Sequence, residues 1–104
     1  MLAPMSVIAM PSPERLDALC RRWKIRSLHL FGSVARGEAR PDSDVDLLVE
    51  YQPDARWSLL DASAMRDDFA ELFERPVDLV MERNIVNPYR LKSILRDKRP
   101  LYAA

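Results

Sequence analysis

Three acidic residues lie in short apolar segments where a β-strand would hold their side chains in fixed positions. Asp44 and Asp46 begin the segment Asp44–Glu50, and Asp78 lies in the segment Val77–Met81. Because strand side chains alternate, Asp44 and Asp46 point to one face, about 6.6–6.8 Å apart. At that distance two carboxylates repel each other by about 2–3 kcal/mol in a medium of intermediate dielectric constant. A divalent cation, Mg²⁺ or Mn²⁺, offsets this repulsion because it prefers carboxylate oxygens.

Asp78 joins the same cluster if its strand lies beside Asp44–Glu50. Three carboxylates can hold two metal ions roughly 3.5–4 Å apart, an arrangement that clamps the attacking and leaving oxygens in phosphoryl transfer. One ion would hold a triphosphate, and the other would lower the pKa of an acceptor hydroxyl. Asp78 is placed either to ligate this second ion or to accept the proton of the hydroxyl. Asp44, Asp46 and Asp78 are therefore the predicted metal ligands and catalytic residues.

A possible phosphate site precedes the acidic residues. The chain has only two glycines, Gly32 and Gly37, and both fall between the first two predicted strands. Glycine at position 32 permits positive φ and close approach of a ligand to the backbone. Successive backbone N–H groups at such a turn can cradle a phosphate, and the Ser33 hydroxyl adds a donor. Arg36 can also reach a phosphate, although a solvated loop arginine explains it equally well.

Each of these acidic residues alone has an ordinary structural explanation. Asp44 can cap a turn, Asp46 can pair with an arginine, and Asp78 can mark an exposed edge strand. The combination is less common: Gly-Ser, ten residues, then Asp-x-Asp is expected by chance in on the order of one in a thousand chains of this length. The set as a whole therefore favours a functional site.

The elements that must position these residues are predicted from capping and periodicity. Capping residues start three helices, at Ser12-Pro13, at Ser58 with Asp61 (a helix to about Glu74), and at Asn87-Pro88 before Pro100. The predicted strands are Ile25–Phe31, Asp44–Glu50 and Val77–Met81. The order α-β-β-α-β-α suits a small α/β or α+β domain, with a three-stranded sheet covered by helices.

Helical spacing also predicts which side chains are buried. The residues expected to line the buried sides of the second and third of these helices are Leu60, Met65, Phe69, Leu72 and Phe73, then Leu91, Ile94 and Leu95. The basic residues near the C-terminal end are Arg90, Lys92, Arg96, Lys98 and Arg99. Because cations commonly stabilise helix C-termini, we interpret most of them as structural.

Composition limits the classes of protein. The 104 residues suit one domain, expected over residues 12–104 after a leader of residues 1–11 that is too short to span a bilayer. Sixteen basic and sixteen acidic residues cancel, which argues against nucleic acid as a direct ligand. Cys20 is the only cysteine, and we interpret it as a buried helix residue. No internal disulfide can form, so a cytoplasmic protein is expected.

The segment FGSVARGEARPDSDVDLLVE, with Gly32-Ser33, Asp44 and Asp46, together with Asp78 in a later strand, resembles the polymerase-β-type nucleotidyltransferase superfamily. In its small size the chain is similar to the minimal nucleotidyltransferase (MNT) antitoxins of HEPN–MNT toxin–antitoxin pairs. The resemblance extends from about Leu16 to Tyr102. It implies a mixed sheet with the triphosphate at Gly32 and Ser33 and metal at the three aspartates.

The resemblance implies an antitoxin of a type VII-like pair. The reaction would be Mg²⁺-dependent transfer of AMP from ATP to a tyrosine of the cognate HEPN ribonuclease toxin, with release of pyrophosphate. No second domain is apparent that would bind another acceptor, so a protein partner in a hetero-oligomer is expected to supply the hydroxyl. Two alternatives stay open: a non-catalytic antitoxin that neutralises its partner by binding, and a nucleotidyltransferase that acts on RNA or a small molecule.

Overall fold

A four-stranded sheet organises the computed structural model, which describes residues 10–40 and 42–104. Most of the expected leader, residues 1–9, therefore lies outside the described residues. The elements in chain order are α1 (Pro13–Arg22), β1 (Ile25–Phe31), α2 (Gly32–Ala35), β2 (Val45–Tyr51), α3 (Leu59–Phe73), β3 (Val77–Val80), the 3₁₀ helix η1 (Glu82–Asn84), α4 (Pro88–Asp97) and β4 (Arg99–Ala103).

Side-chain caps start the three longer helices, as their sequences predict. The Ser12 hydroxyl accepts a hydrogen bond from the backbone N–H of Arg15 at 3.3 Å. Ser58 and Asp61 form a reciprocal capping box, with N–H to side-chain oxygen distances of 3.0 and 3.1 Å. The Asn87 side chain accepts two N–H groups from the first turn of α4. These bonds satisfy donors that the helix itself leaves free.

The strand order is β3-β2-β1-β4, with β1 antiparallel to β2 and β4, and β3 parallel to β2. The α+β class with a mixed sheet is confirmed. The prediction of three strands was wrong, because the chain continues past α4 into β4, on the free edge of β1. Pro100 lies within β4, opposite His29. A proline is tolerated there because one side of an edge strand has no ladder bonds to make.

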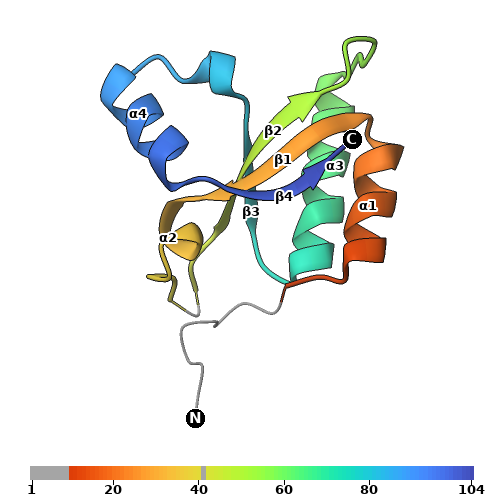
Figure 1. Ribbon diagram of the computed structural model, residues 1–104. Coiled ribbons are helices and arrows are strands. Elements are labelled where there is room, and N and C mark those ends of the chain that lie inside the picture. Colours follow the sequence, from red (N-terminus) through yellow and green to blue (C-terminus); the bar gives the residue numbers. More distant parts are fainter. Residues whose placement is uncertain (1–9, 41) are drawn as a thin grey trace.

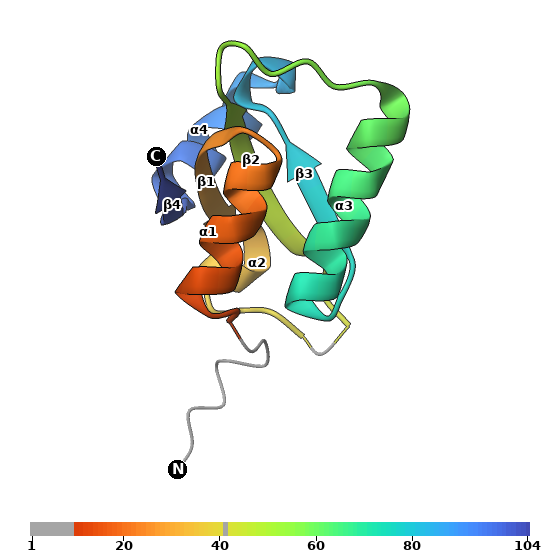
Figure 2. The same ribbon diagram turned by 90° about the vertical axis from the view of Figure 1, so that its right-hand side faces the viewer.

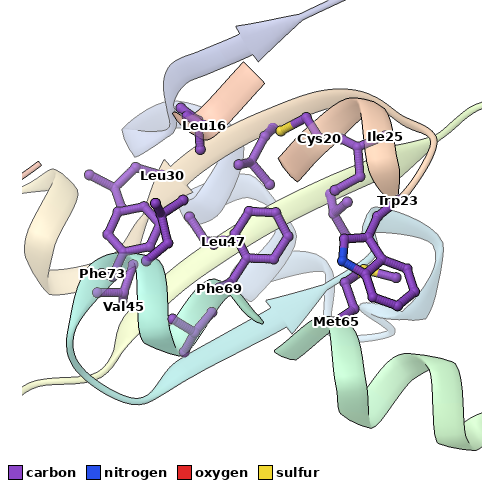
Figure 3. Packing of buried hydrophobic residues seen from close by; sticks show 14 of the residues in the cluster. Leu16, Cys20, Trp23, Ile25, Leu30, Val45, Leu47, Met65, Phe69 and Phe73 are labelled. Atoms are coloured by element: carbon purple, nitrogen blue, oxygen red, sulfur yellow. The ribbon is translucent and has the colours of Figure 1, made fainter. Parts of the chain in front are cut away.

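Helices lie on both faces of this sheet (Figures 1 and 2). We call the face covered by α1 and α3 the closed face, and the opposite face, toward α2 and α4, the open face. Side chains from β1 and β2 interdigitate with α1 and α3 on the closed face (Figure 3). The largest fully buried side chains are Phe69, Ile25, Leu28, Leu47, Met65, Val45 and Cys20. Burial raises the pKa of the Cys20 thiol to about 12, which makes it a poor nucleophile.

The open face carries a smaller apolar cluster, in which α4 packs on the sheet. Its buried members are Phe31, Leu48, Ile85 and Ile94. Because Phe31 and Asp46 are register partners and Leu48 follows Asp46 by two residues, this cluster lies next to Asp46 on the same face. The packing of α4 therefore sets one wall beside the predicted site.

Two predicted core positions are exposed. Leu60 is 83% exposed and the preceding Leu59 is 90% exposed, so the burial expected for Leu60 was wrong. The first turn of α3 lies at the end of that helix farther from the strands, and its buried stripe begins only at Met65 (Figure 2). Leu95 is also exposed, since Ile94 takes the inward position on α4.

None of the helices formed by residues 10–40 and 42–104 is long and apolar enough to cross a membrane.

Candidate functional site

Asp46 and Asp78 lie side by side on adjacent parallel strands. They are register partners in the β2–β3 pair, so their side chains leave the sheet on the same face. A hydrogen bond of 2.9 Å from the Val45 N–H to the Pro76 carbonyl fixes this register where the two strands begin. Asp46 is partly buried and Asp78 is exposed. The structure thus brings together two of the three predicted carboxylates.

Gly32 lies directly against the carboxylate of Asp46. A Cβ atom built on Gly32 would overlap Oδ2 of Asp46 and lie 3.1 Å from its Cγ. The φ angle of Gly32 is +76°, a conformation that other residues rarely adopt. The sequence predicted close approach of a phosphate at this glycine, whereas the group that lies against it in the structure is the Asp46 carboxylate. Ser33 follows as the second residue of α2.

Asp44 lies at the edge of this arrangement. β2 begins at Val45, so Asp44 is one residue outside the strand in which it was predicted, and its side chain is exposed. The loop before it is held from the α3–β3 turn, where the Arg75 guanidinium donates to the carbonyls of Ser43 at 2.9 Å and Arg40 at 3.2 Å. Hydrogen bonds from the Arg75 side chain to the loop backbone therefore fix where Asp44 leaves the loop.

Asp46 is the carboxylate of this group whose ionised form is disfavoured by its surroundings. Burial raises its pKa, and the nearby carboxylates of Asp78 and Asp44 raise it further. The positive charges of Arg90 and Arg36 act in the opposite direction. Asp46 is thus a carboxylate whose ionised form needs additional positive charge nearby.

The donor chemistry of this group suits a hard divalent cation. No three Asp, Glu, His or Cys residues in the described part of the chain form a group that could by itself hold a metal ion. Magnesium seldom needs such a group, because it is usually bound by one or two carboxylates together with water and the phosphates of a substrate. The Asp46–Asp78 pair, with Asp44 beside it, fits that pattern.

Arg36 is engaged by two carboxylates. Its Nε lies 2.9 Å from Oε1 of Glu38, and one terminal nitrogen lies 3.5 Å from Oδ2 of Asp97 in α4. Arg99 of β4 also contacts α2, by donating to the Ala35 carbonyl at 2.7 Å. Arg36, which was predicted to contact phosphate, therefore joins the end of α2 to α4 in this structure.

Arg90 lies near the predicted site, although sequence reasoning did not place it there. It was counted among helix-end charges, yet it lies in the first turn of α4 and its charge reaches Asp46. The structure shows no ion pair between Arg90 and any other described residue. The available signal was the Asn87-Pro88 cap, which places Arg90 at the helix N-terminus, where helix-dipole arguments do not favour a cation.

A groove of about 1000 Å³ lies elsewhere on the open face, beyond Leu48. Charged residues in its lining include Glu50, Arg56, Glu82, Arg83 and Lys98, and His29 lines it as well. None of the predicted site residues lines it. The groove is large, but no two of its lining residues are carboxylates at paired positions of adjacent strands. We therefore do not assign the reaction to this groove.

Comparison with known proteins gives a consistent family. A family model described as a nucleotidyltransferase domain matches residues 13–101. A Methanocaldococcus jannaschii protein, provisionally named a protein adenylyltransferase, is 38% identical over 79 residues, which cover 76% of this chain and 79% of the relative. The protein adenylyltransferase MntA of Thermococcus cleftensis is 37% identical over 79 residues, covering 76% of this chain and 77% of the relative.

Solved structures share the fold. One provisionally described as a minimal nucleotidyltransferase is 39% identical, with a TM-score of 0.68 over 85% of this chain and 87% of that one. A toxin–antitoxin crystallised with AMP-PNP gives a TM-score of 0.69 at 20% identity, over 89% of this chain and 74% of that one. A tri-AMPylated HEPN toxin of Shewanella oneidensis in complex with its MNT antitoxin gives 0.61 at 18% identity, over 88% and 70%. The last two likenesses show the fold alone.

Proposed function

This chain belongs to the nucleotidyltransferase domain family and is a nucleotidyltransferase, and from that premise we propose that it transfers AMP from ATP to a tyrosine hydroxyl of a HEPN toxin partner. The observation that carries the proposal is the in-register pair Asp46 and Asp78 beside Gly32. That pair places carboxylate oxygens directly against the backbone turn at Gly32, where a side chain would displace Asp46.

The reaction exchanges one bond to the α-phosphorus for another. The acceptor oxygen attacks the α-phosphorus of ATP, the bond to the bridging oxygen breaks, and pyrophosphate leaves. A divalent cation, when bound, would polarise the triphosphate and lower the pKa of the acceptor hydroxyl. Asp44, Asp46 and Asp78 are the residues that would hold such cations.

The remaining roles belong to the chain itself. In our proposal the backbone at Gly32 and the Ser33 hydroxyl receive the triphosphate, and Asp78 accepts the proton of the attacking hydroxyl. Asp78 suits this role because its side chain is exposed while Asp46 is partly buried. An incoming protein hydroxyl therefore meets Asp78 first. Arg36 adds a phosphate contact if it exchanges its ion pair with Asp97 for the nucleotide.

The choice of acceptor rests on relatives. The T. cleftensis relative is named a protein adenylyltransferase, and the S. oneidensis complex contains an AMPylated HEPN toxin. The open face offers support, because Asp44 and Asp78 are exposed at its edge and accessible to a second protein. We propose that this chain likewise adenylylates a protein and that it forms a complex with a HEPN toxin.

Transfer of AMP to the toxin tests the function directly. The purified chain is incubated with ATP, Mg²⁺ and the protein encoded by the neighbouring gene as the candidate toxin, and intact-mass spectrometry follows the addition of AMP to that protein. We expect addition by the wild type and none by Asp46→Asn or Asp78→Asn. Glu50→Gln is the matched control, since it removes a carboxylate from the same strand and face at a distance from the pair. Equal addition by all four proteins contradicts the proposal.

A second function is neutralisation of the toxin by binding alone. It is favoured by the lack, among the described residues, of a self-sufficient metal-binding group. The two functions separate in cells that express the toxin. Asp46→Asn keeps its protective effect if binding suffices and loses it if AMP transfer is required, while co-purification with the toxin shows that the variant still binds.

A further inference from the structure

One stripe of α4 faces the open side of the sheet above the site. Arg90, Ile94 and Asp97 follow one another at spacings of four and three residues, so they lie on the same side of the helix. Ile94 is 5% exposed and packs with Phe31 and Leu48, the two apolar residues that flank Asp46 on the open face. The contacts of Ile94 therefore fix the stripe over the part of the sheet that carries Asp46.

The two ends of this stripe carry opposite charges and differ in their partners. At the C-terminal end, Asp97 binds Arg36 at 3.5 Å and Arg96 at 3.2 Å. At the N-terminal end, Arg90 is exposed and has no ion pair with a described residue. Ile94, one turn after Arg90, packs on the two residues that flank Asp46, so the Arg90 side of α4 faces the acidic pair. The uncommitted guanidinium beside the acidic pair thus belongs to α4.

We propose that Arg90 is a phosphate-binding residue of this site and contacts the triphosphate of the incoming nucleotide; this inference rests on the proposed function. A triphosphate brings several negative charges next to three carboxylates, so a nearby cation is needed in addition to any metal ion. A guanidinium binds phosphate oxygens through paired hydrogen bonds. Arg36 must give up carboxylate partners before it can do so, whereas Arg90 has none to lose.

Nucleotide affinity tests the role of Arg90 without relying on turnover. Isothermal titration calorimetry measures the binding of a non-hydrolysable ATP analogue in the presence of Mg²⁺. We expect Arg90→Ala to weaken binding about ten- to a hundredfold, the effect of losing hydrogen bonds to a charged group. Lys92→Ala is the matched control, because Lys92 is exposed on α4 two residues farther on and points away from the stripe. It should stay within about twofold of the wild type.

Four further readouts separate phosphate binding from a structural role. Arg90→Ala should leave the melting temperature unchanged, since the side chain is exposed, and should leave the weaker binding of AMP nearly unchanged. Arg90→Lys should restore part of the lost affinity, and in the transfer assay Arg90→Ala should raise the KM for ATP more than it lowers kcat.

Failure of this inference differs from failure of the proposed function. If Arg90→Ala binds the analogue as tightly as the wild type does, the inference is wrong, although AMP transfer by the wild type still supports the function. If the wild type neither binds the analogue nor transfers AMP, both are wrong. Equal losses in Arg90→Ala and Lys92→Ala also contradict the inference, because general surface charge then explains the effect.

Discussion

The two faces of the sheet are formed by the same strands but carry different kinds of residue: buried apolar side chains on the closed face and neighbouring carboxylates on the open face. On the closed face, Val45 and Leu47 of β2 are 0% exposed and pack under α1 and α3. Between them Asp46 points to the open face, beside Asp78, where burial and like charges raise its pKa. One strand thus alternates between residues that stabilise the fold and a residue held in an unfavourable environment.

The comparison shows where stability and chemistry are separated in a small domain. The closed face has an extended apolar cluster, whereas the buried apolar cluster of the open face has four residues. We infer that the closed face supplies the stability that lets the open face keep like charges close together. Substitutions on the two faces should therefore have different consequences.

Gly32→Ala should have the largest effect, because it places a methyl group where Oδ2 of Asp46 lies. Displacing the carboxylate that we propose to hold metal would remove several kcal/mol of transition-state stabilisation, so AMP transfer should fall by about a thousandfold. Gly37→Ala is a close control, because Gly37 has a similar φ of +74° but no atom within 4 Å of the added Cβ. Each alanine also adds a backbone strain of about 1–2 kcal/mol.

Chemical denaturation and the transfer assay, applied to both glycine variants, separate these contributions. Both variants should lose stability, but only Gly32→Ala should lose transfer under conditions where the protein is folded. Loss of transfer in Gly37→Ala to the same extent would show that backbone strain, and not the position of Asp46, governs activity.

Leu28→Ala tests the closed face alone. Leu28 is 0% exposed in β1 and points away from the carboxylates, so truncation leaves a cavity among α1, α3 and the sheet. The free energy of unfolding should fall by about 3 kcal/mol, measured by urea denaturation. The kcat of the fraction that stays folded should be close to that of the wild type. A change in kcat larger than the loss of folded protein would show that the two faces are coupled.

Local signals in the sequence predict much of this architecture. Three capping sites, three strand positions and the pairing of Asp78 with the second strand are all confirmed. Helix caps and strand alternation depend on residues that are close together in the chain, so they can be recognised in a single sequence. Asp46 and Asp78 are placed well for the same reason, because each lies inside an apolar strand and must face a polar region.

The features that could not be predicted depend on contacts between distant segments. β4 contains Pro100, which locally indicates a break, and it becomes a strand only because β1 offers an unpaired edge. The ion pair of Arg36 with Asp97 joins residues 61 positions apart. Arg90 acquires its position near Asp46 from the packing of Ile94 on Phe31 and Leu48. In each case the partners lie far apart in the chain, so caps and periodicity do not show which residues meet.

Asp46→Asn has the smallest expected effect on folding. It is also a sharp test of the comparison between the two faces, because activity should fall while stability rises. The variant should lose AMP transfer yet unfold at a higher temperature, by an amount worth about 0.5–2 kcal/mol at about pH 7. The folded-state pKa of Asp46 lies above the ordinary value of 3.8. Stability from this group is therefore fully present below 3.8 and is lost as pH rises through the raised pKa.

Asparagine does not titrate, so the advantage of the variant should be small at about pH 4 and grow toward about pH 7. Differential scanning calorimetry without divalent ions measures it, with Glu50→Gln as the control for loss of an exposed carboxylate. Adding Mg²⁺ should raise the melting temperature of the wild type and have less effect on the variant, because ligand binding stabilises the folded state. A variant less stable than the wild type at neutral pH would mean that Asp46 supports the fold, and the separation between the two faces would not hold.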